Sequence, residues 1–508
     1  MHTYDHEAPV EGATATLLSE PGAPGAGAEA MTRAVTGWRV GIAAGAQLAG
    51  RVVGLALGLG VAATLGRGLG TAHFGDLMTA LLLLSLVAPL LDFGLGSIAV
   101  REMAAEPQSR AQIAGAVILV RLVAGVALAL VAMAGAVALF HTWDQRWAAV
   151  GALLSLPLSA LGTYQAVAQA RLRPELISAM VLTQSTVWLA AVVVLTQLHA
   201  PLAAYGLGYT VSVAAQGGVQ WWLCHGLSKI EFRNAGVRAR RLYSMSWPLG
   251  LTFIFTTTYY RMDSILLYRI GGSAATGRYT AAYRFLDSLQ IVPNTMVSVL
   301  LPVLSSLWGD PLRRPRAQRL LSSVLTVGLA AVLPLVVGGM ILSGPIVTVI
   351  YGPAFRGSAR LLTELLPAFV FIFFGYVTTS LLTATRQLRA LSVIALVGAV
   401  LNVAANLVLI PRFGADAAAW TTVATEGLVV ALGGLVAFRG VGMRLPVNRW
   451  LRIGAAGAAL AGALLVVRRL PLPVAILLGG GVYLVAVVVL RAVDITELRA
   501  MLRRGMDA

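Results

Sequence analysis

The sequence contains very few of the residues on which redox, metal and nucleotide chemistry depend. Its single cysteine, Cys224, has no partner for an internal disulfide, and it argues against a cysteine-based metal site. Its single lysine, Lys229, does not stand in a G-x-x-x-x-G-K-[ST] motif, which argues against a nucleotide-binding P-loop. The six histidines form no H-E-x-x-H motif and no paired ligand set. We therefore expect no cofactor, no metal site and no catalytic residue.

Charged residues are scarce as well, at 12% of the chain, whereas hydrophobic residues reach 58%. Soluble domains have about 25% and about 45–50% respectively. Apolar runs of about 20 residues, each enough to cross about 30 Å of hydrocarbon, recur along most of the chain. They predict an all-α polytopic membrane protein with about 14 transmembrane helices. The expected spans are 38–65, 77–98, 112–140, 147–169, 176–198, 202–225, 244–269, 277–307, 320–350, 360–384, 389–410, 415–438, 451–468 and 473–491.

The basic residues lie mainly on one side of these spans. With a cytoplasmic N-terminus, 25 Arg and Lys residues fall in cytoplasmic segments and 9 in external ones. This asymmetry follows the positive-inside rule and places both termini in the cytoplasm. It also explains the net charge of +17 by topology and contact with anionic membrane lipids, so we expect no nucleic-acid partner.

Composition and span positions together predict the domain organisation. Residues 1–37 are rich in Gly, Ala and Pro and are expected to form a disordered cytoplasmic tail. Two six-helix lobes follow at 38–226 and 244–438, joined by a basic cytoplasmic linker at 227–243. Two additional transmembrane helices at 451–491 and a cytoplasmic tail at 492–508 complete the chain.

A short polar break occurs twice, once in each predicted lobe. "RGLGTAHFG" at 67–75 and "RIGGSAATG" at 269–277 agree in type at five of nine positions, with an offset of 202 residues. Six helices separate the copies, and an even separation keeps both lobes in the same orientation through the membrane. The spacing predicts parallel repeats that form a V-shaped bundle around a central cavity, an arrangement typical of alternating access. In a chain with 54 glycines, a chance match is the alternative.

The eighth span carries a polar stripe. Thr280, Arg284, Asp287, Gln290, Asn294 and Ser298 recur every three or four residues and therefore share one helix face. The stripe extends over about 27 Å, which favours a helix that lines a water-filled cavity. In the alternative interpretation, Arg284 and Asp287 only neutralise each other and lock neighbouring helices together.

Other spans also contain ionisable residues, which are costly in lipid and tend to face protein or water. Arg51 lies near mid-bilayer in the first span, and Gly54 and Gly58 after it are expected to allow close helix approach. Arg261 and Asp263 in the seventh span point about 200° apart. Membrane-buried arginine suits an anionic head group, because its guanidinium matches phosphate and stays charged.

Two further charged positions leave alternatives open. Glu426 has no nearby base, so it is expected either to carry a proton or to hydrogen-bond to another helix as a structural group. Arg121 lies close enough to the cytoplasmic interface for snorkelling to explain it.

Several collinear segments resemble the lipid-linked oligosaccharide (Wzx-type) flippases of the multidrug/oligosaccharidyl-lipid/polysaccharide exporter superfamily. The resemblance covers about residues 38–440. Its segments are "LGRGLGTAHFG" at 65–75, "LLDFGLGSIAVREMA" at 90–104, "YYRMDSILLYRIGGSAATGRYTAAYRF" at 259–285, "PNTMVSVLLPVLSSL" at 293–307, "IYGPAF" at 350–355 and "NVAANLVLIPRFGADAAAWTTVATE" at 402–426.

This resemblance implies a flippase of the bacterial inner membrane. It would move an undecaprenyl-diphosphate-linked oligosaccharide from the inner to the outer leaflet for cell-surface or exopolysaccharide synthesis. The site residues expected to contact the diphosphate and glycan are Arg51, Arg261, Arg284, Gln290 and Asn294, and the coupling-ion candidates are Asp263, Asp287 and Glu426. The expected partners are the lipid-linked oligosaccharide, membrane lipids, a proton or sodium ion, and glycan polymerases.

Two other functions compete with this interpretation. A cation-coupled multidrug exporter would share the superfamily, the fold and the repeat. A membrane glycan polymerase or ligase would need a sizeable extramembrane segment, whereas the longest expected loop here, 226–243, is under twenty residues. If the cargo is a diphosphate, the membrane potential supplies about 2.3 kcal/mol per charge per 100 mV without ATP.

Overall fold

A computed structural model of the chain describes residues 26–171, 173–227, 229–309, 311–441 and 446–493. Throughout these residues the secondary structure is helical, with no strand. The helices of the first half are α1 (Ala26–Asp92), α2 (Leu95–Ala105), η1 (Pro107–Ser109), α3 (Arg110–Leu139), α4 (Trp143–Leu153), α5 (Ser155–Leu158), η2 (Ser159–Gly162), α6 (Thr163–Ala170), α7 (Pro174–Gln197) and α8 (Leu202–Cys224). Those of the second half are α9 (Ala235–Leu289), α10 (Ile291–Trp308), η3 (Pro311–Arg313), α11 (Arg314–Ile341), α12 (Ser343–Tyr351), η4 (Pro353–Phe355), α13 (Arg356–Ala384), α14 (Leu388–Val441), α15 (Val447–Val467) and α16 (Leu472–Val489).

The helices give fourteen membrane crossings, which confirms the predicted fold class. Ten continuous helical stretches in the described part of the chain are long and apolar enough to cross a membrane. Three of them, Val52–Ala105, Tyr260–Trp308 and Leu388–Ala437, are 54, 49 and 50 residues long. Each of these three provides two crossings, because about 20 residues suffice for one. The 23-residue helix α8 completes the set.

Glycines mark the turn inside each of the three long helices. α1, α9 and α14 leave helical geometry at Gly70, Gly272 and Gly414, all with positive φ. Gly70 (φ 69°, ψ −178°) and Gly272 (φ 80°, ψ 174°) have nearly the same conformation. They occupy matching positions of the repeated nonapeptide, so the repeat seen in the sequence is a repeat of backbone geometry.

The two copies of the nonapeptide also pack against each other. A Cβ built on Gly75 would lie 2.0 Å from the Ser273 carbonyl oxygen, and one on Gly277 would lie 1.9 Å from the Thr71 carbonyl oxygen. These contacts are symmetric, because Thr71 and Ser273 hold matching positions in the two copies. The reciprocal packing is what two parallel repeats related by a twofold axis predict.

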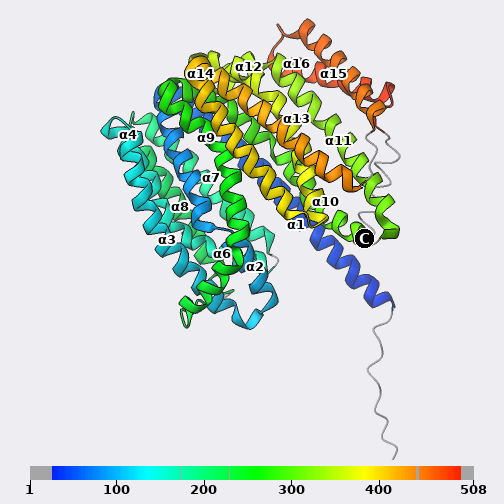
Figure 1. Cartoon of the computed structure of the whole chain (residues 1–508). Helices are drawn as coiled ribbons and strands as arrows, with labels where there is room; N and C mark the ends of the chain where they lie inside the picture. The colour runs from blue at the N-terminus through cyan, green and yellow to red at the C-terminus, as the bar shows by residue number, and fades with distance from the viewer. Residues whose placement is uncertain (1–25, 172, 228, 310, 442–445, 494–508) are drawn as a thin grey trace, which may run out of the picture.

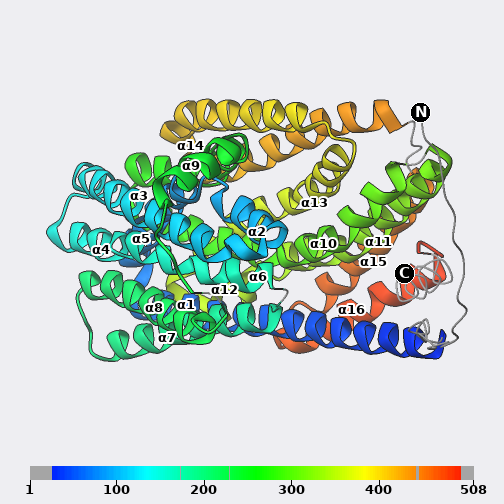
Figure 2. The same ribbon diagram turned by 90° about the horizontal axis from the view of Figure 1, so that it is seen from below.

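The two halves of the chain lie on either side of this crossing. In Figure 1 helices α2 to α4 and α6 to α8 of the first half lie on the left, α11, α13, α15 and α16 lie toward the right, and α1 and α9 pack against each other. α14 packs on α9 and runs from the upper left toward the right. In the view from below in Figure 2, α3, α4, α7 and α8 again lie on the left and α11, α15 and α16 on the right. α15 and α16 pack on each other and on α11 at the outer edge of the second half.

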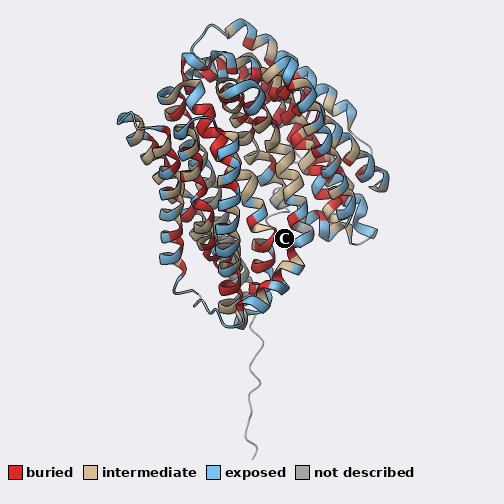
Figure 3. Cartoon of the chain, turned by 60° about the vertical axis from the view of Figure 1, so that its left-hand side comes forward, coloured by how far each residue is buried: buried red, intermediate tan, exposed pale blue. Residues whose placement is uncertain are grey.

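The outer surface of the bundle is apolar. Exposed positions follow the outward faces of the helices in Figure 3, and they include Val131, Trp222, Val466 and Leu477. Large exposed apolar surfaces are rare on soluble monomers, and lipid is the solvent that suits them. The chain is therefore a multi-pass membrane protein.

Two predicted boundaries differ from the structure. α1 begins at Ala26, inside the segment expected to be a tail, and α9 begins at Ala235, inside the expected linker. The predicted eighth span is also interrupted, since α9 ends at Leu289 and α10 begins at Ile291. Pro293 explains the interruption, because its ring excludes the carbonyl of residue 289 from a continuous helix and it has no N–H to donate.

Candidate functional site

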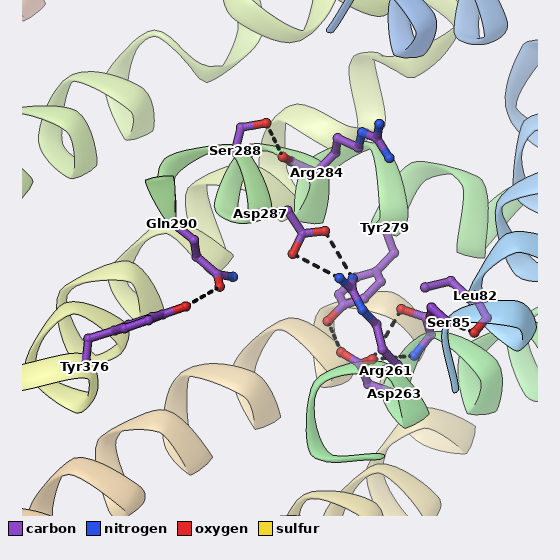
Figure 4. A network of polar contacts seen from close by, with 11 residues as sticks. Leu82, Ser85, Arg261, Asp263, Tyr279, Arg284, Asp287, Ser288, Gln290 and Tyr376 are labelled. Carbon is purple, nitrogen blue, oxygen red and sulfur yellow. Dashed lines mark hydrogen bonds and ion pairs between the residues drawn. The ribbon is translucent and has the colours of Figure 1, made fainter. Parts of the chain in front are cut away.

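An ion pair joins the two halves of α9. The Arg261 guanidinium contacts Asp287 through two hydrogen bonds, Nη1 to Oδ2 at 3.1 Å and Nη2 to Oδ1 at 3.4 Å (Figure 4). The side chains are 28% and 31% exposed, so the pair lies at a surface inside the bundle. The Arg261 guanidinium also lies 5.8 Å from the centre of the Tyr283 ring. Asp287 therefore pairs with Arg261, and the alternative in which Arg284 and Asp287 neutralise each other is wrong.

Arg284 is a second cation on the same helix, and its charge is not compensated nearby. Among the described residues, its guanidinium makes no ion pair and no hydrogen bond, and Figure 4 shows it directed away from the Arg261–Asp287 pair. Its Nη2 lies 3.8 Å from the position of a Cβ on Gly58 of α1. A half-buried guanidinium without an acid is costly in an apolar bundle, so it needs water or an anionic ligand.

The glycines opposite Arg284 provide space. No described atom lies within 4 Å of a Cβ built on Gly54, and only the Arg284 Nη2 atom lies that close to one on Gly58. The expectation that these glycines bring two helices into contact is therefore wrong. Instead, Gly54 faces a region without described atoms, and the Arg284 guanidinium is the described group nearest to Gly58.

Asp263 lies on the opposite side of α9 from Arg261 and is only 1% exposed. Its carboxylate accepts hydrogen bonds from the Tyr279 hydroxyl, the Ser264 N–H at 2.6 Å, the Ser264 hydroxyl at 3.2 Å and the Thr422 hydroxyl at 3.4 Å. Arg261 and Asp263 thus have different partners, as their spacing on the helix predicts. The hydrogen bond from Thr422 to Asp263 links α14 to α9.

Glu426 lies further along α14 and is 2% exposed. It is hydrogen-bonded to Tyr260 of α9. Buried polar groups surround it on α14, where Asn406 donates to Asn402 at 3.0 Å and Asn402 donates to Thr425 at 3.4 Å. The contact with Tyr260 fits the structural alternative for Glu426, and its role as a proton carrier stays a prediction.

The remaining site predictions have different outcomes. Gln290 accepts a hydrogen bond from the Tyr376 hydroxyl at 3.1 Å, and Asn294 donates to the Gln290 carbonyl at 3.0 Å on the exposed side of α10. Thr280, Arg284, Asp287 and Gln290 are all partly exposed, whereas Tyr279, Ala282 and Leu286 between them are buried. Arg51 lies within α1, but its side chain is outside the described part of the structure, as is that of Ser298.

A cavity of about 780 Å³ lies beside these groups, on the first half of the chain. It is lined by residues of α1 to α3 and α5 to α8, and Phe253 of α9 contributes from the second half. Tyr209 in its wall lies within electrostatic range of the Arg284 guanidinium, which does not itself line the cavity. The lining residues of α1 begin at Leu81, beyond the Gly75 contact, so the cavity lies on one side of the crossing.

A second ion pair lines this cavity. The Arg121 guanidinium contacts the Asp92 carboxylate and donates to the Thr163 hydroxyl at 3.4 Å. The Arg121 side chain is 11% exposed, so it turns into the first half of the bundle. Snorkelling to the membrane interface, the interpretation left open from the sequence, is therefore wrong for Arg121.

Five glutamines of the cavity wall are missing from the sequence-based site: Gln165, Gln169, Gln184, Gln216 and Gln220. The sequence does contain a pattern that marks four of them. Gln165 and Gln169 are four residues apart within an apolar span, as are Gln216 and Gln220, so each pair shares a helix face. Unlike Gln290 and Asn294, however, none of the five glutamines shares a helix face with a charged residue of its own predicted span, so they did not stand out as a polar stripe.

The two halves of the chain are joined firmly at the nonapeptide crossing. The Tyr268 hydroxyl donates to the buried Asp76 carboxylate at 2.9 Å, and Arg67 donates to the Ile350 carbonyl at 3.1 Å. Phe74 packs edge-on against Tyr351 and Phe355 at ring distances of 5.8 and 5.3 Å. We refer to this end of the bundle as the closed end.

A bundle of fourteen membrane-spanning helices, with a closed end at the α1–α9 crossing and a cavity with glutamine and serine side chains to one side of it, is typical of a membrane transporter. A family model described as polysaccharide biosynthesis protein matches residues 44–308, and one described as lipid II flippase MurJ matches residues 266–471. The chain belongs to the polysaccharide biosynthesis protein family. It is thereby placed in the multidrug/oligosaccharidyl-lipid/polysaccharide exporter superfamily.

Solved structures show the same fold at low sequence identity. The lipid II flippase MurJ in an inward closed conformation superposes with a TM-score of 0.70 at 12% identity, over 89% of this chain and 99% of that chain. An inward-facing MATE family multidrug resistance transporter of the MOP superfamily gives 0.61 at 14%, over 78% and 98%. A MOP superfamily transporter from Pyrococcus furiosus gives 0.57 at 13%, over 79% and 95%. No curated protein matches the sequence.

Proposed function

We propose that this protein flips an undecaprenyl-diphosphate-linked oligosaccharide from the inner to the outer leaflet of the bacterial inner membrane, for cell-surface or exopolysaccharide synthesis. The observation that carries the proposal is Arg284. A half-buried cation that makes no ion pair with the described residues, and whose Nη2 atom lies 3.8 Å from the Cβ position of Gly58 on α1, suits an anionic head group. Arg261 lies on the same helix and supplies a second guanidinium when Asp287 releases it.

The orientation of the bundle supports the direction of transport. With both termini in the cytoplasm, as the basic residues predict, the nonapeptide crossing lies at the external side and the cavity opens toward the cytoplasmic half. A lipid-linked glycan made in the cytoplasm would then enter this conformation directly. The closed end must separate before the glycan leaves, as alternating access requires.

Buried acids of the second half are the candidates for ion coupling. Asp263 is surrounded by hydroxyl and amide groups of α9 and α14, and Glu426 lies on the same face of α14 as Thr422. Protonation of Asp263, or a sodium ion in its place among these oxygens, would change the contact between the two helices. Asp287 is the third candidate, because losing its charge frees Arg261.

Reconstituted vesicles test this proposal. Undecaprenyl-diphosphate-N-acetylglucosamine is placed in one leaflet, and its arrival in the other is measured with an impermeant lectin. Transport well above that of protein-free vesicles is expected, and it should rise with an imposed potential that drives anions outward. Equal transport rates with and without the imposed potential would rule out a contribution of the membrane potential. Absence of lipid transport would contradict the flippase assignment.

A drug-efflux arm separates the competing function. The same vesicles are loaded with ethidium, a cationic substrate suited to a multidrug exporter. Ethidium transport without lipid transport would favour the exporter alternative. In cells, a deletion strain should accumulate undecaprenyl-linked intermediates on the cytoplasmic leaflet.

A further inference from the structure

The glutamine-lined cavity of the first half differs in chemistry from the Arg261 and Arg284 surface. Its wall contains five glutamines and the side chains of Ser85, Ser97, Ser155 and Ser159. Its charged side chains, Asp92 and Arg121, contact each other directly, so they contribute no net charge. The cavity therefore offers hydrogen bonds to a neutral polar ligand and has no free charge with which to bind an ion.

The glutamines are arranged toward a common space. On α8, Tyr209, Val213, Gln216 and Gln220 follow one helix face, and on α6, Gln165 and Gln169 do the same. Gln220 is 2% exposed, and its Oε1 atom has no hydrogen-bond partner among the described residues. A buried acceptor without a donor is unfavourable, and a hydrogen bond from a ligand hydroxyl would satisfy it.

We propose that this cavity is a binding subsite for the neutral saccharide part of the lipid-linked substrate. A primary amide both donates and accepts hydrogen bonds, which is what a sugar hydroxyl or acetamido group needs. The volume of about 780 Å³ falls in the range of sites that enclose drug-sized ligands, so it suits a short oligosaccharide. Hexoses and N-acetylhexosamines fit this chemistry, whereas a hexuronate would bring an uncompensated charge.

The subsite rests on the proposed function, and it divides the substrate between the two halves of the protein. The diphosphate lies at the arginines of α9, and the sugars extend into the first half toward Gln216 and Gln220. Tyr209 of the cavity wall lies within electrostatic range of Arg284, so a single ligand can reach both regions. Specificity for the glycan then lies mainly in α6 and α8.

Three lipid probes test the subsite by binding to the full-length protein in nanodiscs. They are undecaprenyl diphosphate alone, undecaprenyl-diphosphate-N-acetylglucosamine and the corresponding glucuronic acid conjugate. The wild-type protein should bind the N-acetylglucosamine conjugate about tenfold more tightly than the bare lipid. The glucuronic acid conjugate should show no such gain, because its carboxylate enters a cavity with no free cation.

Gln216→Leu and Gln220→Leu should each lower the affinity for the N-acetylglucosamine conjugate about fivefold to tenfold and leave binding of the bare lipid unchanged. Gln197→Leu is the matched control, since Gln197 is exposed at the end of α7 and does not line the cavity. Gln220→Asn keeps the amide and should retain part of the sugar-dependent gain, which separates recognition from folding.

The outcomes distinguish the subsite from the proposed function. If none of the lipids binds, the flippase assignment fails and the subsite fails with it. If the bare lipid binds but the sugar adds no affinity, or if the glutamine variants keep the full gain, the subsite is overturned and the flippase assignment stands. A gain for the glucuronic acid conjugate equal to that for N-acetylglucosamine also overturns the neutral-saccharide assignment.

Discussion

At the residue scale, two arginines of α9, Arg261 and Arg284, are in different electrostatic situations. Arg261 is compensated by Asp287 and lies close to the Tyr283 ring. Arg284 has no acid beside it in the described part of the chain, so an approaching diphosphate does not have to break an ion pair there. Arg284 is therefore expected to bind the diphosphate first. Arg261 becomes available to the ligand only when it separates from the Asp287 carboxylate.

This difference predicts the behaviour of Arg284→Gln. Transport of the lipid-linked saccharide should fall at least tenfold, because charge-assisted hydrogen bonds to phosphate are lost. The melting temperature in detergent should stay within about 2 °C of wild type, since no described partner loses a contact. Arg240→Gln, at an exposed position near the start of α9, is the control and should change neither quantity. Wild-type transport by Arg284→Gln would contradict the assigned role.

At the element scale, the repeated nonapeptide determines how α1 and α9 cross. Gly70 and Gly272 turn the chain in a conformation that residues with a Cβ rarely adopt. Gly75 and Gly277 then allow the backbone of each copy to lie against a carbonyl of the other. Two different properties of glycine, its backbone freedom and its missing Cβ, are thus used at separate positions of one motif.

Alanine at the crossing tests the second property. Gly75→Ala and Gly277→Ala should each destabilise the protein by about 1–3 kcal/mol or more, because the new Cβ would overlap a backbone carbonyl. Gly218→Ala on α8 is the control: no described atom lies within 4 Å of its Cβ position, so its stability should be unchanged or slightly raised. Thermal unfolding in detergent measures the stability of all three variants. If Gly75→Ala and Gly277→Ala melted at the wild-type temperature, the close packing of the two motif copies would not contribute to stability.

At the scale of the whole molecule, the closed end contains the crossing of α1 and α9, and the cavity lies to one side of it. Asp76 is 4% exposed, and the Tyr268 hydroxyl is its hydrogen-bond donor across the crossing. Opening of the closed end would expose the Asp76 carboxylate to water. The hydrogen bond from Tyr268 to Asp76 is therefore one of the contacts that must break during alternating access.

Tyr268→Phe should shift the population toward opening of the closed end. It leaves a buried carboxylate without its donor, which costs the closed form about 1–3 kcal/mol. Spin labels are attached at Trp143→Cys and Phe413→Cys in a Cys224→Ser background, and pulsed electron paramagnetic resonance measures the distance between them. In Tyr268→Phe, the fraction of molecules with the longer distance should increase several-fold. Tyr243→Phe, which keeps its stacking on Phe93 at the other end, is the control. An unchanged distance distribution in Tyr268→Phe would contradict this role.

The candidate site was only partly predictable from the sequence. The spacing of Arg261 and Asp263 was enough to give them opposite directions, because helix geometry is local. The choice of Asp287 rather than a closer residue as the partner of Arg261 depends on the turn at Gly272, which brings the two halves of α9 together. The glutamine cavity was missed for a similar reason, since its residues come from several helices and none of the five glutamines shares a helix face with a charged residue of its own span.

The sequence by itself determined the number of crossings, the positions of the turns and the existence of a repeat. Each of these follows from local properties: the length of an apolar run, the absence of a Cβ, or the recurrence of a motif. Only the tertiary structure decided that the two motif copies pack against each other, that Asp92 compensates Arg121 and that Arg284 is left uncompensated. Such pairings depend on which helix faces meet across the bundle, and the long-range packing that sets them is not encoded in any single span.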